Sequence, residues 1–346
     1  MSRIFVHGLG AVSPAGWGVS ALCEALRKNE PIPTVALARA GWSQPLHVRP
    51  VPPPSERPAF LAHPRLRRSS AITQHTVGAA LEALGPDAAH VQNGELRLGI
   101  VVCLLSGSVT YSRRFYEEVL NDPAVASPML FPETVYNAPG SHLASYLSTN
   151  TVSYTLVGDD SSFLQGLAVA AGWLLNNQVD GCLVVGAEES DWLIADAIRL
   201  FARRAVQGAG AGAIYLRRDE PATPAAELAR ITDAFAFTSP DSRANAAKDI
   251  LAQLLPCNAG ELLCLGTQGL HHRNADEAAA WSNWPGPRLA PKQILGEAFT
   301  ASAAWQCVAA CDAVGRGEFN AANISVVGAY QQAIGARFIR AITSLK

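Results

Sequence analysis

TVSYTLVGDDSSFLQGLAVAAGW, residues 151–173, reads as a β-strand that turns sharply into a helix. The β-branched run ends at Gly158, Asp159 and Asp160 form the turn, and a run of small and apolar residues begins a helix at Ser161. Such a turn presents a side chain at a helix N-terminus, where backbone N–H groups favour negative charge. Asp160 is therefore the candidate functional residue of this stretch, either as a catalyst or as the remnant of one.

The composition is typical of a globular protein. The 346 residues are 49% hydrophobic and 16% charged, which leaves enough apolar material for a large core. The formal net charge of −2 provides no basic field for nucleic acid. No apolar run approaches about 18 residues, and the N-terminus lacks the charged-then-apolar pattern of a signal peptide. We therefore expect a cytoplasmic protein without membrane insertion.

The seven cysteines indicate neither a disulfide framework nor a metal site. They form no CxxC pair, and most lie among apolar neighbours, as small buried residues do. Cys307 and Cys311 are one helical turn apart, but no nearby His or further Cys completes a ligand set. The glycine run at 208–212 lacks a following lysine and leads into a strand, unlike a phosphate-binding loop. We therefore expect no metal and no other cofactor.

Apolar runs typical of buried strands alternate with helical patterns along the chain. Strands are expected at 3–9, 98–105, 180–186 and 261–265, and a long helix at 295–314. The glycines and the proline that follow the first run, Gly8, Gly10, Pro14 and Gly16, predict a loop there. This alternation predicts an α/β fold whose parallel or mixed sheet is covered by helices on both faces.

The alternation occurs twice, before and after a linker at 221–224. We therefore expect two similar halves, an N-terminal half at 1–220 and a shortened C-terminal half at 221–346. Prolines between residues 31 and 64 predict an irregular or extended arm. A small basic cluster follows this arm and fits either a solvated face or a contact with a partner; it consists of Arg65, Arg67 and Arg68.

Several motifs along the chain follow the pattern of one known family. RIFVHGLGAVSPAGWG at 3–18 is similar to the opening strand of the β-ketoacyl-ACP synthases of the thiolase superfamily, and residues 131–189 are similar to that family's dimer-loop region, nucleophile elbow and GGAE strand. GAGAGAIYL at 208–216 resembles GEGAGxLVL, LGTQG at 265–269 resembles HGTGT, and KQILGEAFTASAA at 292–304 resembles KSxxGHxxGAAG. The resemblance covers most of the chain in the same order. It implies a thiolase-like fold, with two similar α/β halves in a five-layer αβαβα arrangement.

Ketosynthases condense acyl groups with a Cys nucleophile and two His residues. The resemblance places the Cys at Asp160, the first His at Leu265 and the second at Glu297, while the family's Lys is retained as Lys292. A carboxylate nucleophile would form a water-labile anhydride instead of a thioester. Leu265 has no hydrogen-bond donor, and an ionised Glu297 would oppose the negative charge of an enolate. The family's glycine-rich gate falls on GAYQQAIG at 328–335. The resemblance thus implies a chain that does not condense acyl groups alone.

The leading hypothesis is a chain-length-factor-like subunit. Such a chain pairs with a catalytic ketosynthase and shapes the acyl tunnel in type II polyketide, aryl polyene or fatty-acid-like biosynthesis. The strand at 151–157 would pair across the interface, and the loop at 133–142 would reach the partner's tunnel. Acyl carrier protein is a second expected partner. The sequence is compatible with a homodimer as well as a heterodimer.

The alternative hypothesis is a repurposed enzyme. Asp160 and Glu297 would then act as an acid/base carboxylate pair, with one pKa raised and the other lowered. A purely structural interpretation instead makes Asp160 a helix-capping carboxylate that is paired with Lys292.

Two other groups of polar residues favour structural interpretations. Ser161 and Ser162 have no recognisable base and are interpreted as N-cap residues rather than nucleophiles. His271 and His272 lie in the polar segment HHRN and are interpreted as solvent-facing rather than catalytic.

Overall fold

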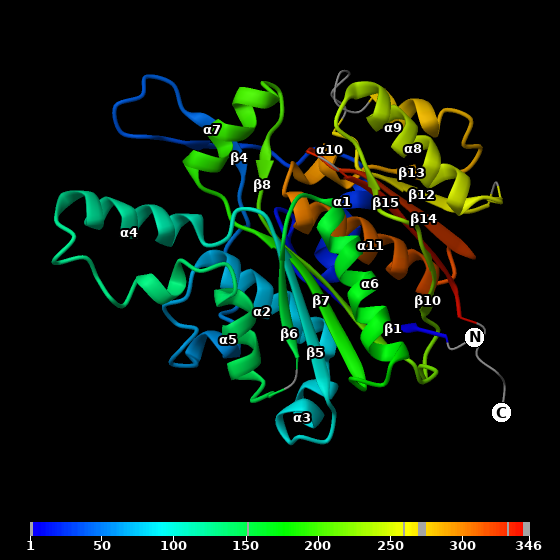
Figure 1. Cartoon of the computed structure of the whole chain (residues 1–346), viewed down its shortest axis with the longest axis horizontal. Helices are drawn as coiled ribbons and strands as arrows, with labels where there is room; N and C mark the ends of the chain where they lie inside the picture. Colours follow the sequence, from blue (N-terminus) through cyan, green and yellow to red (C-terminus); the bar gives the residue numbers. More distant parts are fainter. Residues whose placement is uncertain (1–2, 151, 259, 269–274, 331, 342–346) are drawn as a thin grey trace.

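The structure is a computed structural model that describes residues 3–150, 152–258, 260–268, 275–330 and 332–341 (Figure 1). Within these residues, ten strands follow one another across a mixed sheet, in the order β13 (Arg288–Leu289), β12 (Leu262–Leu265), β14 (Ala321–Val327), β15 (Gln332–Arg340), β10 (Ala226–Ile231), β1 (Phe5–Ser13), β9 (Gly210–Arg217), β7 (Gly181–Glu188), β5 (Leu98–Leu104) and β6 (Ser153–Val157). Two short strands extend this sheet to twelve: β11 (Phe235–Ala236) pairs with β15, and β2 (Gly16–Trp17) pairs with β1.

The two halves of this sheet repeat one topology. The order β6-β5-β7-β9-β1 in the N-terminal half matches β13-β12-β14-β15-β10 in the C-terminal half. In each half the second strand is parallel to both of its neighbours, and the fourth strand is antiparallel to both of its neighbours. The halves meet where Phe5 of β1 pairs with Glu227 of β10. This repeat confirms the two similar halves expected from the sequence.

Helices and sheet halves form five layers (Figure 1). The outer helices of the N-terminal half are α2 (Ala71–Leu84) and α5 (Ala138–Tyr146), and those of the C-terminal half are α8 (Pro240–Leu254) and α9 (Ala275–Ala280). The middle layer consists of α6 (Ser161–Leu175) and α11 (Phe299–Gly315), and α11 contacts strands of both halves. The largest cluster of buried apolar side chains surrounds these two helices. The αβαβα arrangement is therefore confirmed.

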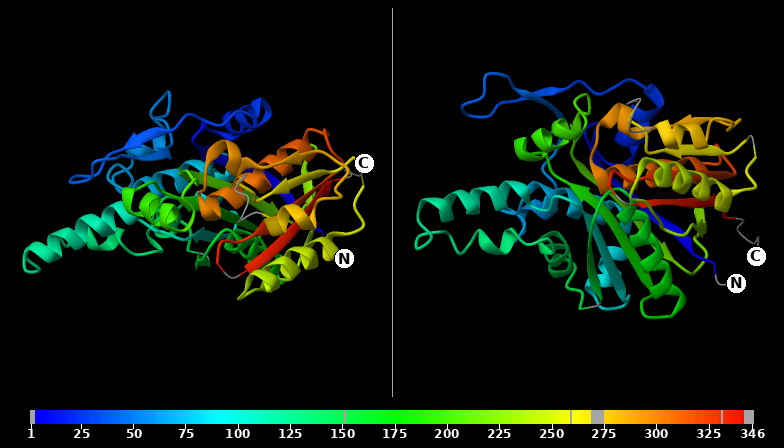
Figure 2. Two further views of the ribbon diagram at one scale, coloured as in Figure 1. Left: turned by 90° about the horizontal axis from the view of Figure 1, so that it is seen from above. Right: turned by 45° about the horizontal axis from the view of Figure 1, so that its top comes forward.

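The remaining elements lie around this body. They are α1 (Val19–Lys28), β3 (Val35–Leu37), β4 (Leu46–Arg49), η1 (Ala59–Ala62), α3 (Asp87–Gln92), α4 (Val109–Asn121), η2 (Phe131–Glu133), α7 (Trp192–Phe201), β8 (Gln207–Gly208) and α10 (Pro291–Leu295). Figure 2 shows that α4 extends away from the body in both further views. None of the described helices is long and apolar enough to cross a membrane.

The loop expected at the opening glycines is wrong for Gly8 and Gly10, because β1 continues to Ser13, and the chain turns only at Pro14 and Ala15 before β2. A Cβ atom on Gly8 would lie 1.8 Å from the carbonyl oxygen of Ala83, and one on Gly10 would lie 1.9 Å from that of Ala79. Ala79 and Ala83 belong to α2, so these glycines let the helix backbone approach the strand closely. They serve packing rather than a turn.

The arm at 31–64 is more regular than the sequence indicates. Its strands β3 and β4 are antiparallel, and β4 pairs in parallel with β8 to form a small three-stranded sheet. The prolines lie between these elements, and the partner strand β8 comes from about 160 residues further on. A pairing with so distant a segment has no local sequence signal.

The long helix expected at 295–314 is divided into α10 and α11 by residues 296–298. Gly296 has φ 91°, and the backbone of Glu297 pairs with the segment at β8. We propose that the boundary between the two halves lies near residue 220, because β9 ends at Arg217 and β10 begins at Ala226.

Candidate functional site

The turn between β6 and α6 is stabilised by Asp159. The Ser161 backbone N–H and hydroxyl donate to Oδ1 of Asp159 over 3.2 and 2.7 Å, and the Tyr330 N–H donates to its Oδ2 over 3.0 Å. Asp160 occupies the N-cap position but accepts no capping hydrogen bond. The interpretation of Asp160, Ser161 and Ser162 as capping side chains is therefore wrong, since Asp159 satisfies the first N–H groups of α6.

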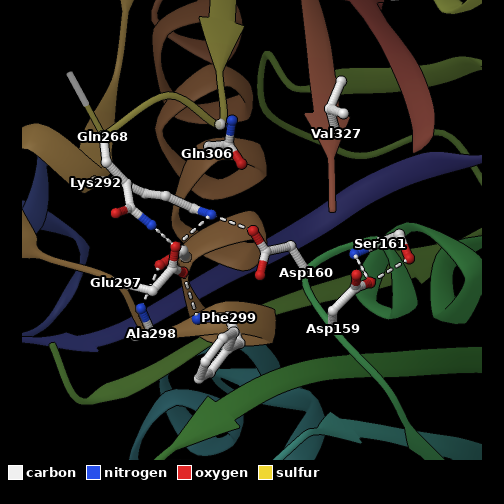
Figure 3. A network of polar contacts seen from close by, with 12 residues as sticks. Asp159, Asp160, Ser161, Gln268, Lys292, Glu297, Ala298, Phe299, Gln306 and Val327 are labelled. Carbon is white, nitrogen blue, oxygen red and sulfur yellow. Dashed lines mark hydrogen bonds and ion pairs between the residues drawn. The ribbon is translucent and has the colours of Figure 1, made fainter. Parts of the chain in front are cut away.

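Asp160 instead belongs to a buried ionic network. Lys292 Nζ donates to Asp160 Oδ2 and, over 3.0 Å, to Glu297 Oε2 (Figure 3). Asp160 is 1% exposed, Lys292 4% and Glu297 5%. The proposed pairing of Asp160 with Lys292 is present, and the lysine links both candidate carboxylates. The fold thus brings together three of the four site residues expected from the sequence.

Glu297 is held on every side by hydrogen-bond donors. Gln268 Nε2 and Lys292 Nζ donate to Oε2, and the Phe299 N–H donates to Oε1 over 2.9 Å. Phe299 begins α11, so the carboxylate lies at a helix N-terminus, where negative charge is favoured. Gln268 follows β12 in a turn, and its position in LGTQG was not singled out from the sequence. The sequence did carry a signal for this residue, because position 268 is Gln where the similar motif HGTGT has glycine.

The backbone around Glu297 fixes the carboxylate in place. The Glu297 N–H donates to the Val206 carbonyl over 2.8 Å, and the Gly208 N–H donates to the Glu297 carbonyl over 2.8 Å. Phe299 has φ 41°, which is uncommon for a side chain of this size. Such strain persists where the surroundings hold the conformation, and here the Phe299 N–H is bound by the carboxylate of Glu297, whose own backbone is fixed on both sides.

Leu265 does not join this network. It ends β12 and is 5% exposed within the apolar cluster below α8, together with Trp281 and Val327. Leu263 belongs to this same cluster, whereas Leu262 and Cys264 belong to the cluster around α11. The fourth expected site position is therefore part of the outer core.

The charges of the network shift the pKa values of its members. Burial alone would lower the pKa of Lys292, but the charges of Asp160 and Glu297 outweigh it and raise this pKa. Burial, together with the negative charge of Asp160, raises the pKa of Glu297 to about 7. Burial and the same Asp160 charge also raise the pKa of Asp159. At neutral pH the ammonium of Lys292 is thus shared between two carboxylates, one of which is close to its titration midpoint.

Two further buried glutamates lie outside the ionic network. Glu188 accepts hydrogen bonds from the backbone N–H groups of Leu105 and Ser106 over 2.5 and 3.1 Å, and Glu277 accepts one from Gly266 over 3.3 Å. Burial raises the pKa of Glu188 to about 8 and that of Glu277 to about 7, from an ordinary value of 4.5. Between these values the folded protein binds more protons than the unfolded chain, so stability falls as the pH rises through this window.

Glu277→Gln is expected to flatten the pH dependence of stability. The amide cannot ionise, so the folded protein no longer loses a proton from this site between about pH 5 and pH 8. The difference in unfolding free energy between pH 5 and pH 8.5 should shrink by about 2 kcal/mol. Urea titrations at pH 5, 7 and 8.5 measure this difference. Glu30→Gln changes an exposed glutamate and is the control. If the unfolding free energy changed with pH to the same extent in both variants, the raised pKa assigned to Glu277 would be contradicted.

Other residues considered from the sequence have no place in this site. Within the described residues, no group of three or more His, Cys, Asp and Glu side chains could hold a metal ion. Cys307 and Cys311 are buried in the central core. His271 and His272 lie outside the described residues. Arg65, Arg67 and Arg68 are exposed, and among the described residues their guanidinium groups form no ion pair.

Comparison with known proteins places the fold in a class, the thiolase-like ketosynthase fold. No protein-family profile and no curated protein sequence matches the chain. Solved structures do match it. The ishigamide ketosynthase/chain length factor is similar with a TM-score of 0.81 and 19% sequence identity, and the match covers 97% of this chain and 99% of that chain.

Two other solved structures give the same result. A β-ketoacyl synthase from Burkholderia phymatum has a TM-score of 0.81 and 15% identity, and covers 99% of this chain and 100% of its own. A ketosynthase in complex with its chain length factor from Xenorhabdus doucetiae has a TM-score of 0.79 and 13% identity, with 98% of each chain covered. The thiolase-like fold expected from the motifs is therefore confirmed.

Proposed function

We propose that this chain is a non-condensing ketosynthase homologue that acts as a chain-length-factor-like partner of a catalytic ketosynthase. The observation that carries the proposal is the position of Lys292 between Asp160 and Glu297. Each of these groups is buried and ion-paired, so none is free to attack an acyl thioester. A chain that keeps the fold without the nucleophile fits a subunit that shapes a neighbouring active site.

The edge strand β6 offers a route to this assembly. Ile100 N–H donates to the Val152 carbonyl, and Gly158 N–H donates to the Leu104 carbonyl, so the even-numbered residues of this segment face β5. Peptide groups alternate along a strand, and those of Ser153, Thr155 and Val157 therefore face away from β5. Among the described strands none pairs with this edge. A strand of the partner can add to it.

A second exposed surface, made of apolar side chains, lies on α4 and the loop that follows it. Seven large side chains on it are exposed: Tyr116, Leu120, Val125, Met129, Phe131, Val135 and Tyr136. Groups of exposed large apolar side chains mark interaction sites. The surface projects from the body (Figure 2), and it includes the start of the 133–142 loop that we expect to reach the partner's tunnel.

Acyl carrier protein is the second proposed partner. One of the similar solved structures is an acyl carrier protein in complex with its ketosynthase, at 17% identity and a TM-score of 0.79, covering 98% of this chain and 99% of that chain. The exposed arginines at 65, 67 and 68 supply positive charge for an acidic partner. Biosynthesis of an aryl polyene or a related type II polyketide is the narrower proposal for the pathway.

One observation favours the repurposed enzyme as a second candidate. The pKa of Glu297 is raised to about 7, which suits general acid/base catalysis at neutral pH. Opposing this, Lys292 binds both carboxylates, and a substrate would have to displace it. Hydrolytic or isomerising activity of the chain alone, lost in Glu297→Gln, would favour this candidate.

Asp160→Asn distinguishes the chain-length-factor-like partner from the repurposed enzyme. We expect the variant to assemble with a co-expressed catalytic ketosynthase and to support product formation within about twofold of the unaltered complex, because no chemistry passes through residue 160. Co-purification and product mass spectrometry measure the two quantities. An assembled complex that forms no product would overturn the structural role. Asp160→Cys is the converse test, because it places the family's nucleophile at position 160. It should not confer condensation activity, because residues 265 and 297 still lack the required histidines.

A further inference from the structure

Helix α7, which packs on β4 and β8, is apolar around most of its circumference. Only two of its ten residues are charged, Asp196 and Arg199. Ala195 and Ile198 are buried on its packed side. Three large apolar side chains of the same helix are nevertheless exposed: Leu193, Leu200 and Phe201. Because a helix that is apolar all round is normally covered, the outward side of α7 has the composition of a contact surface.

The segment between β3 and β4 continues this surface. The guanidinium carbon of Arg39 lies 3.7 Å from the ring centre of Trp192, the first residue of α7, and 4.5 Å from that of Trp42. The guanidinium carbon of Arg199 lies 6.0 Å from the same Trp42 ring, and Trp42 is exposed. Cation–π contacts thus hold the segment against the helix at the periphery of the molecule (Figure 1). We call this the arm–α7 surface, and it consists of Arg39, Trp42, Leu193, Arg199, Leu200, Phe201, Arg203 and Arg204.

The arm–α7 surface carries an excess of positive charge. Residues 35–49 and 190–206 contain five arginines and two aspartates, a net charge of +3, whereas the whole chain has −2. Both aspartates, Asp191 and Asp196, are already in ion pairs with arginines. Three of the four arginines of the surface form no ion pair with another described residue: Arg39, Arg203 and Arg204. The surface is therefore suited to an anionic partner.

The sign of this charge distinguishes the arm–α7 surface from the apolar surface on α4. Residues 109–122, which contain α4, have two arginines and three acidic residues, and such mixed charges suit a protein partner with a complementary pattern. The arm–α7 surface instead combines excess positive charge with exposed Trp, Leu and Phe side chains, and interfacial helices bind anionic membranes with this combination. A bilayer also accepts protruding apolar side chains without a preformed pocket. These features favour a lipid surface over a folded protein.

We propose that the arm–α7 surface docks the chain on an anionic lipid bilayer. Trp42, Leu200 and Phe201 enter the boundary between headgroups and acyl chains, where such side chains are stabilised. Arg203 and Arg204 follow α7 directly and bind lipid phosphates through charge-assisted hydrogen bonds. Docking of this kind needs no membrane-spanning helix. It does not depend on the proposed pairing with a ketosynthase.

Flotation of the purified full chain with lipid vesicles tests this assignment. Vesicles of phosphatidylcholine with about 40% phosphatidylglycerol should bind the chain about tenfold or more tightly than vesicles of phosphatidylcholine alone, because each arginine near an anionic surface adds attraction. Added salt should weaken this binding, since it screens exposed charges. Equal binding to both kinds of vesicle, or no binding to the anionic vesicles, would overturn the assignment.

A matched pair of leucine variants locates the apolar contact. Leu200→Ser should weaken binding to the anionic vesicles about fivefold or more, because it removes an apolar side chain from the boundary region. Leu120→Ser on α4 should leave the binding unchanged. Both leucines are 69% exposed, so neither substitution should disturb folding. Equal effects of the two substitutions would overturn the assignment.

A matched pair of arginine variants locates the charge contact. Replacing Arg203 and Arg204 together by Gln should weaken binding to the anionic vesicles about tenfold or more. Replacing Arg67 and Arg68 together by Gln removes the same charge from another exposed site and should leave the binding unchanged. Equal losses would reduce the effect to nonspecific charge and would also overturn the assignment.

A protein partner at this surface would give a different result. Binding of purified acyl carrier protein that is lost in Leu200→Ser, with no binding to anionic vesicles, would assign the surface to an acidic protein and overturn the lipid assignment. The proposed pairing with a ketosynthase is measured separately by co-purification. Failure of the one proposal is therefore distinguishable from failure of the other.

Discussion

Lys292→Met is expected to lower the free energy of unfolding by about 3–5 kcal/mol. The substitution removes the cation from between Asp160 and Glu297, both of which are buried. Removing one partner of a buried ion pair costs this much because the remaining charge has no compensation in a low-dielectric interior. Asp160 Oδ1 already has no hydrogen-bond partner among the described residues, so the loss of Lys292 leaves this carboxylate with very little stabilisation. Urea unfolding at pH 7 measures the effect.

Two controls distinguish this charge effect from the loss of a long side chain. Lys248→Met, at an exposed position on α8, should change stability by less than about 0.5 kcal/mol. Adding Asp160→Asn and Glu297→Gln to Lys292→Met should restore part of the lost stability, because no unpaired buried charge remains. The deficit of Lys292→Met should also decrease from pH 8 to pH 5 as Glu297, whose pKa is raised to about 7 by burial, binds a proton. A loss below about 1 kcal/mol would contradict the ionic network as a determinant of stability.

Thr155→Pro is expected to weaken assembly with the catalytic ketosynthase by a factor of about 100 or more. The N–H of Thr155 faces the free edge of β6, so proline removes a donor from that edge and leaves the hydrogen bonds to β5 intact. Proline also obstructs the approach of a second strand, and β-addition depends on main-chain hydrogen bonds for its affinity. Affinity purification of the co-expressed pair, followed by analytical ultracentrifugation, measures the effect.

The control for this prediction is the isolated chain. Proline at an edge position is tolerated where the N–H faces outward, so the thermal unfolding of Thr155→Pro alone should stay within a few degrees of the unaltered chain. Val157→Ser changes an exposed side chain on the same strand while keeping the backbone donor, and it should weaken assembly much less. Unchanged assembly of a folded Thr155→Pro variant would show that β6 is not part of the interface.

The sequence predicted the layered α/β fold because its signals are local. Continuous apolar runs at 98–105 and 180–186 became β5 and β7, and the turn at Gly158 led from β6 into α6 as expected. The motifs that resemble ketosynthases also aligned Asp160, Lys292 and Glu297 with one site, and the structure brings these three together.

Three features required the tertiary structure. The glycines at 8 and 10 predict a loop by their local pattern, but their function is the close approach of α2, which involves residues about 70 positions away. The small sheet of the arm depends on β8, which lies about 160 residues further along the chain than β4. Leu265 faces the outer core although the motif that contains it also supplies Gln268 to the network.

The turn at Asp159 and Asp160 shows most clearly what the sequence determines and what only the tertiary structure determines. From sequence alone, Asp160 is interpreted as the capping carboxylate because it stands directly before the first residue of the helix. Packing decided the roles: Asp159 faces the end of β14 and caps the helix, while Asp160 faces Lys292, which is 132 residues away. The sequence determined that a negative charge would stand at this helix start. Only the tertiary structure determined which counter-ion it meets, since an ion pair forms between groups that folding, rather than chain proximity, brings together.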